Sequence, residues 1–343
     1  MTPDFPQLRA SVQHNCHISD ALFARDYSLC IYLLKMREYF RWERGIGFGE
    51  SLPDKELGQW LVEREHLWHE LEDAEFARVP FAGRELDPFA SDELNALLTP
   101  EGLVYSGGYG SSAKPHFFLA DLQRAEVLDG LRVFVAGREY ARDITAPPAM
   151  SIGGTVFVRR ESLQRTLWER LEEWRWHKRD NAMGRAVGHY DFEGDFSTAL
   201  NAMTEREIDT VILHESGEVE AGRRLGPGWE QLLAGVFRTR MEYTARAVRD
   251  HLADCLVTLP TLLARNTAPS IHFFFANLTG MRRALFPSLV RAYEAWHGGD
   301  GNALPRAVAD GRDHWEAVAQ RFLSAFGRDG QKALEVEART IEL

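Results

Sequence analysis

The stretch Ser19-Asp-Ala-Leu-Phe-Ala-Arg-Asp-Tyr-Ser-Leu-Cys-Ile-Tyr-Leu-Leu-Lys-Met-Arg-Glu-Tyr-Phe-Arg-Trp-Glu-Arg44 decides the fold class expected for this chain. Its apolar side chains recur at spacings of three and four residues, which is the period of an α-helix. Ser19 or Asp20 can cap the start, and the glycines at 45 and 47 end it. We therefore predict one long helix with an apolar inner stripe. The stripe consists of Phe23, Tyr27, Cys30, Ile31 and Leu34.

The same period dominates the rest of the chain. A second helix is expected over 54–76, antiparallel to the first because the connection between them is short. Further helices are expected over 161–178, 205–222, 229–236, 239–258, 270–278, 281–297 and 313–326. The capping box Thr204-Glu-Arg-Glu207 favours a helix there over the alternative of a strand at 208–213. Short extended segments are expected at 117–119 and 155–158. The prediction is a mainly α protein, made of helical bundle regions with a minor β element; an α+β arrangement stays open.

The chain length and a polar, glycine-containing segment predict two regions. A chain of 343 residues suggests about two domains. Residues 179–196 are polar and contain glycine, so we place the boundary there. The expected regions are an N-terminal helical region over 1–195, which includes the short β element, and a C-terminal helical region over 196–343.

Composition excludes several classes of function. The net charge of −11 argues against a broad nucleic-acid surface, because an acidic protein repels phosphate backbones. Three cysteines without a CxxC pair fit a reducing compartment. No apolar run suits a signal peptide or a membrane span. We expect a cytoplasmic protein that binds neither nucleic acid nor membrane, with an unknown small molecule or protein as its partner and an unknown oligomeric state.

A polar cluster, His14-Asn-Cys-His-Ile-Ser-Asp20, precedes the first predicted helix. Imidazole, thiolate and carboxylate groups can all bind a transition metal. A helix N-terminus would also lower the pKa of Cys16 and make it a candidate nucleophile. His17 is a candidate metal ligand. The alternative is a polar segment that only caps the helix.

Glu38 lies on or beside the apolar stripe, where an ionised carboxylate is unfavourable unless it is paired or bound to a ligand. It is therefore a candidate catalytic residue. Arg37 and Arg41 are close enough in sequence to pair with it, so a buried Arg–Glu ion pair is the alternative interpretation.

The second half of the chain carries two histidine–carboxylate sets at helical spacing. His214, Glu215 and Glu218 fall within one turn, and Asp254 follows His251 by three residues. Such sets on separate helices can converge on one ion, so these five residues are candidate ligands of a divalent metal, iron or zinc. The alternative is a group of buried polar side chains that satisfy one another.

The chain resembles a bacterial family of uncharacterised proteins. The resemblance is carried by His14-Asn-Cys-His-Ile-Ser-Asp20 and the helix that follows it, Tyr27-Ser-Leu-Cys-Ile-Tyr-Leu-Leu-Lys-Met-Arg-Glu-Tyr-Phe-Arg-Trp-Glu43, and by Arg246-Ala-Val-Arg-Asp-His-Leu-Ala-Asp254 in the second half. It covers an N-terminal and a C-terminal region and implies a bacterial source. It transfers no activity.

Two functional hypotheses follow, and whether the protein is an enzyme stays open. The first is a metal-dependent enzyme, for example a non-haem iron oxygenase or oxidase, with its site between helices. The second is a non-catalytic binding or scaffold protein in which the buried polar groups are structural. P-loop, G-x-S-x-G and H-E-x-x-H signatures are absent from the sequence. Convergence of the five candidate ligands on one point would favour the first hypothesis, and pairing with arginines would favour the second.

Overall fold

The computed structural model describes residues 5–110, 114–177 and 179–343. Contacts divide the chain into two compact units, residues 1–168 and 169–343. The division falls within helix α5 (Arg160–His177), ahead of the boundary expected at 195. Each unit is described by itself.

Unit 1 is built on a five-stranded sheet. The strands are β3 (Leu103–Tyr109), β4 (Pro115–Leu128), β5 (Leu131–Arg142), β6 (Ala149–Ile152) and β7 (Thr155–Arg159). Their order is β3-β4-β5-β7-β6, and β5 and β7 run parallel while the other neighbours are antiparallel. This sheet is larger than the two short extended segments that we expected.

A tight turn joins the two longest strands. Asp129 and Gly130 both have left-handed backbone angles, φ 50° and φ 79°. Positive φ at both central residues is typical of the type I′ hairpin turn, which matches the twist of the strands that it connects. The Asp-Gly pair therefore fixes the β4–β5 hairpin.

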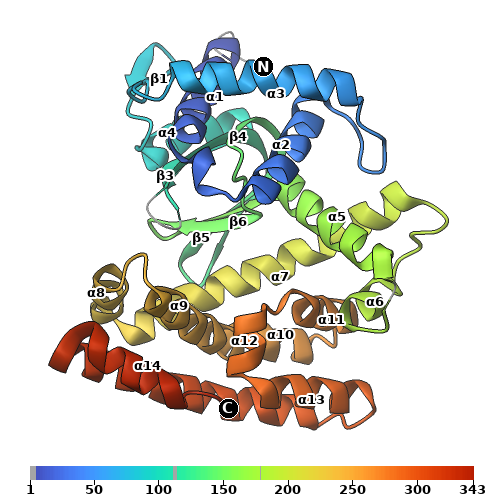
Figure 1. Ribbon diagram of the computed structural model, residues 1–343, viewed down its shortest axis with the longest axis vertical. Helices are drawn as coiled ribbons and strands as arrows, with labels where there is room; N and C mark the ends of the chain where they lie inside the picture. Colours follow the sequence, from blue (N-terminus) through green and yellow to red (C-terminus); the bar gives the residue numbers. More distant parts are fainter. Residues whose placement is uncertain (1–4, 111–113, 178) are drawn as a thin grey trace. The chain divides into compact units, whose positions relative to one another are not determined.

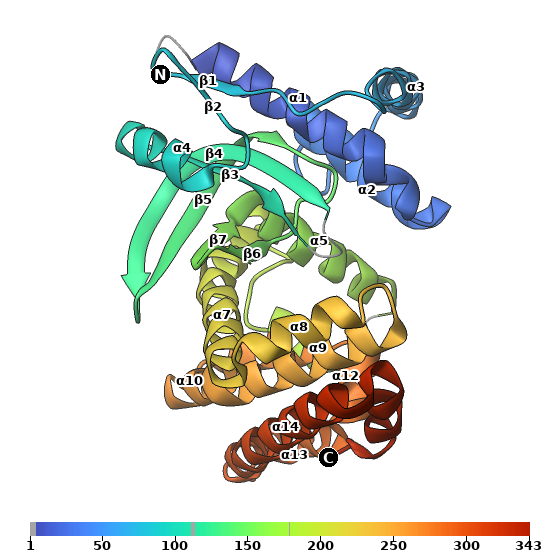
Figure 2. The ribbon, with the colours of Figure 1, turned by 90° about the vertical axis from the view of Figure 1, so that its left-hand side faces the viewer.

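Helix α1 (Phe5–Phe23) packs against β4 and β5, as Figure 2 shows. Its apolar side chains Leu8, Val12 and Cys16 join Leu103, Phe117 and other strand residues in one buried cluster. A smaller hairpin of β1 (Val79–Phe81) and β2 (Arg84–Leu86) and helix α4 (Ser91–Leu98) contribute to the same core.

The helix expected over 19–44 is in fact two helices, α1 and α2 (Leu29–Arg44), because the regular α-helix stops between them. Ser19 and Asp20 lie inside α1 and cap nothing. The expected inner stripe was also wrong, because Ile31 is 46% exposed and Leu34 is 56% exposed. The buried face of α2 carries instead Met36, Tyr39 and Phe40, which pack with Trp60 of α3 (Asp54–Glu70).

The described residues of unit 2 form helices that are joined by short connections. Its helices are α6 (Ala182–Val187), α7 (Phe196–Leu225), α8 (Pro227–Gly235), α9 (Arg240–Ala253), α10 (Leu259–Ala264), α11 (Ala268–Asn277), α12 (Gly280–Leu285), α13 (Pro287–His297) and α14 (Ala303–Glu337). Trp229 and Trp315 are among the largest fully buried side chains of its core. Helices α13 and α14 lie side by side in Figure 1.

Helix α7 includes the segment 208–213, so helix rather than strand is correct there. It begins earlier than expected, because the side chain of Asp195 accepts a hydrogen bond from the Thr198 amide at 3.0 Å and caps it. The predicted capping box at Thr204 is wrong, since this hydroxyl lies inside the helix and donates to the Leu200 carbonyl.

Between α9 and α10 the helix widens into a π-helical turn, Asp254–Thr258. Pro260 lies two residues further on and has no amide hydrogen to donate, which disrupts the regular α-helical bonding there. Such turns are frequent at functional sites. With 14 α-helices assigned among the described residues and one main sheet, the mainly α class with a minor β element is confirmed. None of the helices in the described ranges is long and apolar enough to span a membrane.

Candidate functional site

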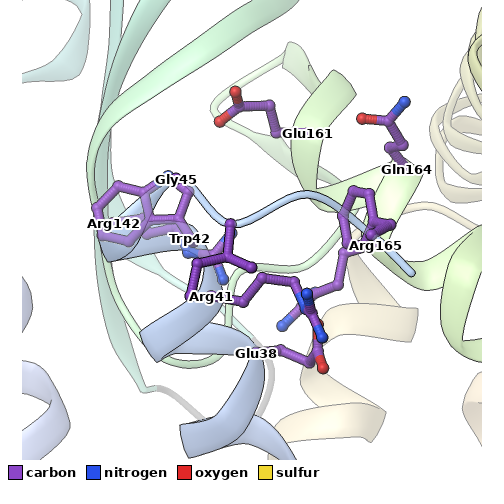
Figure 3. Close-up of a pocket in the computed structure, with 10 residues that line it drawn as sticks. Glu38, Arg41, Trp42, Gly45, Arg142, Glu161, Gln164 and Arg165 are labelled. Carbon is purple, nitrogen blue, oxygen red and sulfur yellow. The ribbon is translucent and has the colours of Figure 1, made fainter. Parts of the chain in front are cut away.

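A pocket of about 200 Å³ lies in unit 1 where three elements end or begin (Figure 3). Arg142 is the last residue of β5, and the loop after α2 contributes Gly45, Ile46 and Phe48. The remaining lining residues are Glu38, Arg41 and Trp42 from the end of α2, and Glu161, Gln164 and Arg165 from the start of α5. Figure 3 shows the α2 and α5 side chains entering from different sides.

A buried ion pair lies beside the pocket. Arg159, at the end of β7, donates from Nε and Nη2 to the two carboxylate oxygens of Glu139, at 2.8 and 2.9 Å. The Ser162 hydroxyl donates to the same carboxylate at 2.9 Å. Burial raises the pKa of Glu139, but the adjacent arginines outweigh it and the pKa lies below its ordinary value. Glu139 is therefore an ionised carboxylate whose oxygens are already well supplied with donors.

Arg142 is left with an incomplete set of partners. Its Nη1 lies 3.5 Å from Glu139, but its Nε and Nη2 are buried and have no hydrogen-bond partner. The residue is only 2% exposed. Its guanidinium lies over the ring of Trp42, 4.9 Å from the ring centre. Unpaired buried donors are unfavourable by roughly 1–3 kcal/mol each, and more when charged, so this edge of Arg142 needs an acceptor.

The electrostatics agree with this geometry. Burial lowers the pKa of Arg142 to about 10, and although Glu139 opposes the shift, the nearby charges of Arg165 and Arg159 add to it. A guanidinium with enough counter-charge keeps its ordinary, much higher pKa. The pocket wall thus carries more positive charge than its carboxylates neutralise.

Glu38 lines this pocket and forms the ion pair that was the alternative interpretation of its position. Arg41 Nε and Arg37 Nε each lie 3.2 Å from its carboxylate oxygens. Arg41 also donates from Nη1 to the carbonyls of Gly47, at 2.6 Å, and Glu50, at 3.1 Å. The pair therefore holds the loop 45–50 against the end of α2.

Cys16 does not have the environment predicted for a nucleophile. It lies in the middle of α1, because this helix starts at Phe5, and its thiol donates to the Phe117 carbonyl at 3.3 Å. Burial raises the pKa of the thiol well above its ordinary range, and the carboxylate of Asp143 raises it further. The expected activation by a helix N-terminus is corrected: Cys16 is a buried, protonated core residue.

The other polar residues of this cluster point in different directions. His17 faces α3, where Arg64 Nη1 lies 2.8 Å from its Nε2; burial and the Arg64 charge lower its pKa to about 3. Asp20 is buried and accepts hydrogen bonds from the Ile144 amide at 3.0 and 3.2 Å. His14 is exposed. The polar side chains of this segment thus contact separate partners instead of forming one site.

In unit 2, three of the candidate metal ligands do meet. His214 lies between two carboxylates, with Nδ1 2.9 Å from Asp254 and Nε2 3.3 Å from Glu218. Burial lowers the pKa of His214, but these two carboxylates outweigh it and hold the pKa well above its ordinary value. Burial and the Glu218 carboxylate raise the pKa of the adjacent Glu215 to about 7.

Arginines pair with both of these carboxylates. Arg249 Nη2 lies 2.6 Å from Glu218, and Arg282 contacts Asp254 from α12. A protonated histidine presents no lone pair to a metal, and paired carboxylates are poor ligands. These contacts favour the alternative of a polar network whose members satisfy one another.

His251 lies apart from this network as a core residue. It is 1% exposed, its ring stacks on Trp315 at 4.7 Å, and its Nε2 lies 3.1 Å from the Arg282 carbonyl. Burial and the charge of Arg282 lower its pKa to about 3. Within residues 5–110, 114–177 and 179–343, no group of three or more His, Cys, Asp or Glu side chains is arranged to hold a metal ion. A divalent metal at these residues stays a prediction, and the observed contacts give it no support.

The sequence interpretation missed Glu139, Arg142 and Arg159. A signal was present for Arg159, which directly follows the apolar run Val156-Phe-Val158, whereas Glu139 and Arg142 stand beside other charged residues. Charged residues that interrupt buried strands are rarely tolerated without a specific partner.

Comparison with known proteins identifies the family. The residues 7–159 match the N-terminal domain, and 164–342 the C-terminal domain, of a family of unknown function, DUF6866. The chain belongs to this family, which confirms the expected resemblance over an N-terminal and a C-terminal region. No curated protein and no solved structure matches it. The function is unknown.

Proposed function

We propose that unit 1 is a binding module that takes a small anion in the pocket between α2, β5 and α5. The observation that carries this proposal is the buried edge of Arg142, whose Nε and Nη2 donors have no partner. An anion at this edge would accept both hydrogen bonds and balance the excess positive charge. The proposal concerns binding alone.

The surroundings of Arg142 support an anion rather than a cation or a neutral group. Its ion-pair partner, Glu139, is already bound by Arg159 and Ser162. Arg165 adds a second charge from α5. Apolar side chains of the pocket exclude water from part of the site, and this strengthens the electrostatic attraction.

Thermal unfolding in the presence of anions tests the proposal. Small carboxylates, sulfate and phosphate are added at constant ionic strength, with chloride as the baseline. An anion that binds the folded state stabilises it by about 2.7 kcal/mol at one hundred times its Kd. We expect this gain in the natural protein and its loss in Arg142→Gln. Equal gains in both proteins would contradict the proposal.

Arg138→Gln is the matched control. This arginine lies on the same strand as Arg142 but is exposed. Its substitution removes one positive charge from unit 1, as Arg142→Gln does. A specific site predicts that this variant keeps the full stabilisation by the anion, whereas a general effect of surface charge predicts a similar loss in both variants.

We also propose a cytoplasmic location in a bacterial cell. The absence of any CxxC pair in this sequence supports the compartment, and the family resemblance supports the source. Fractionation of the source cells tests the location: recovery with the periplasmic or membrane fraction would contradict it.

A further inference from the structure

We infer that the ligand of this pocket is a small monocarboxylate with a compact, planar apolar body. The inference rests on the proposed function and adds the chemical class of the ligand. Three features of the pocket carry it: the geometry of the unpaired donors, the charge of the lining residues, and the apolar surface opposite them.

The two unpaired donors belong to one edge of the guanidinium. The Nε–H and one Nη2–H of an arginine point in parallel and match the two oxygens of a carboxylate. The third nitrogen of Arg142, Nη1, faces Glu139. The Trp42 ring covers a face of the guanidinium plane. A ligand therefore approaches Arg142 along its free edge and in its plane, which suits a flat carboxylate.

The charge of the lining residues suits a ligand with a single negative charge. Three arginines and two glutamates line the pocket, which leaves one net positive charge. Glu161 is held in place as an acceptor, because its Oε2 receives the Glu139 amide at 2.9 Å. A phosphate dianion would bring a second negative charge close to Glu38 and Glu161. Such like-charge repulsion is how sites reject a competing ligand.

The rest of the lining is apolar. Trp42, Ile46 and Phe48 supply this surface, and the ring of Phe48 packs against Trp168 with centres 6.0 Å apart. A volume of about 200 Å³ corresponds to roughly seven water molecules. The pocket is thus smaller than the roughly 300–1,000 Å³ typical of sites for drug-sized ligands. An aromatic or short aliphatic carboxylate fits, and a nucleotide does not.

The loop 45–49 gives the ligand a route to the donors. Gly45 and Gly49 have left-handed φ values of 65° and 87°, and a Cβ at either would meet nothing within 4 Å. Ile46 and Phe48 sit between them. Because Nε and Nη2 of Arg142 are buried, a small displacement of this apolar cover accompanies binding.

Isothermal titration calorimetry of the full chain at pH 8 tests the inference with three probes. They are benzoate, its neutral isostere benzamide, and inorganic phosphate. We expect benzoate to bind with one site per chain, and the other two to bind at least roughly tenfold more weakly. We expect Arg142→Lys, which keeps the charge but removes the parallel donors, to weaken benzoate roughly tenfold or more. Arg138→Lys is the control and should leave the affinity unchanged.

The outcomes test the carboxylate class of the ligand and the anion site separately. Phosphate binding that exceeds benzoate binding and is lost in Arg142→Lys would overturn the carboxylate class and leave the anion site standing. No binding of either anion, or binding that is unchanged in Arg142→Lys, would overturn the anion site itself. If Arg142→Lys does not fold, Ile46→Trp replaces it, because the indole fills the apolar part of the pocket and leaves Arg142 intact. Unchanged benzoate affinity in Ile46→Trp would overturn the assigned position of the apolar body.

Discussion

Glu207 of α7 offers a quantitative test of the energetics of unit 2. Its side chain is fully buried, and its Oε1 accepts a hydrogen bond from the Ser270 hydroxyl at 3.0 Å. The other oxygen, Oε2, is buried without a partner. Burial raises the pKa of Glu207 from its ordinary 4.5 to about 7, although the hydrogen bonds of Thr210 and Ser270 oppose the shift. The ionised form is therefore unfavourable in the folded protein.

The sign of the effect follows from linkage. The folded state keeps the Glu207 proton up to about pH 7, whereas the unfolded chain loses it near pH 4.5. The contribution of Glu207 to the free energy of unfolding is therefore greatest below pH 4.5 and is lost as the pH rises through the folded pKa. The full shift corresponds to about 3 kcal/mol, and most of it is lost between pH 5 and pH 8. Glu207→Gln removes the titrating group and with it this loss.

Urea unfolding of the full chain, followed by tryptophan fluorescence at pH 5 and pH 8, measures the effect. The quantity to compare is the free energy of unfolding of Glu207→Gln minus that of the natural protein at each pH, because other titrating groups cancel in this difference. We expect the difference to be larger at pH 8 by about 2–3 kcal/mol. Glu205→Gln is the control, since Glu205 is exposed on the same helix. Equal differences at the two pH values would refute the reasoning.

Four further substitutions have expected outcomes in thermal unfolding or metal analysis. Gly217→Ala places a Cβ 2.7 Å from a carbonyl oxygen at the end of α9 and should destabilise the protein by roughly 1–3 kcal/mol. Gly222→Ala, with open space around it in the same helix, should stabilise it by up to about 1 kcal/mol, and a Gly217→Ala protein more stable than the Gly222→Ala protein would contradict this reasoning. Glu139→Gln removes the charge that balances a fully buried arginine and should destabilise by roughly 3–5 kcal/mol, whereas a change below about 1 kcal/mol would show that the pair is dispensable. His214→Ala should leave the metal content of protein purified without chelator unchanged, and loss of near-stoichiometric iron or zinc would establish the predicted metal instead.

The helices could be predicted from sequence where their stabilising pattern is local. The period of three and four residues placed α5, α8 and α11 within a few residues of their positions, whereas α7 and α14 extend well beyond the expected ranges 205–222 and 313–326. The pattern failed at Ile31 and Leu34, because apolar side chains at helical spacing do not reveal which face is covered. The β4–β5 hairpin had a strong signal that was overlooked, since Asp129-Gly130 stands between two alternating apolar runs.

The site could be predicted only in part. Glu38 was found because a carboxylate on an apolar stripe is unusual within one helix. Arg142 was not, because its significance depends on the parallel pairing of β5 with β7, which brings Arg159 beside Glu139. Contacts between distant segments leave no periodic trace in a single sequence. The same limit explains why His214 and Asp254 were grouped as candidate metal ligands, while the arginine that pairs with Asp254 was missed.

The π-helical turn at Asp254–Thr258 amounts to one additional residue accommodated within an otherwise continuous helix. Each residue of an α-helix advances the direction of the side chains by about 100°. A residue inserted into a regular α-helix would rotate everything that follows by that angle, and the wider π-helical turn absorbs this rotation. Deletion of a single residue here would restore regular winding and leave the helices on either side in phase, so that Leu259 and Leu262 would keep their places in the core. The additional residue therefore changes the width and the hydrogen bonding of this one turn, and the face that α10 buries does not depend on it.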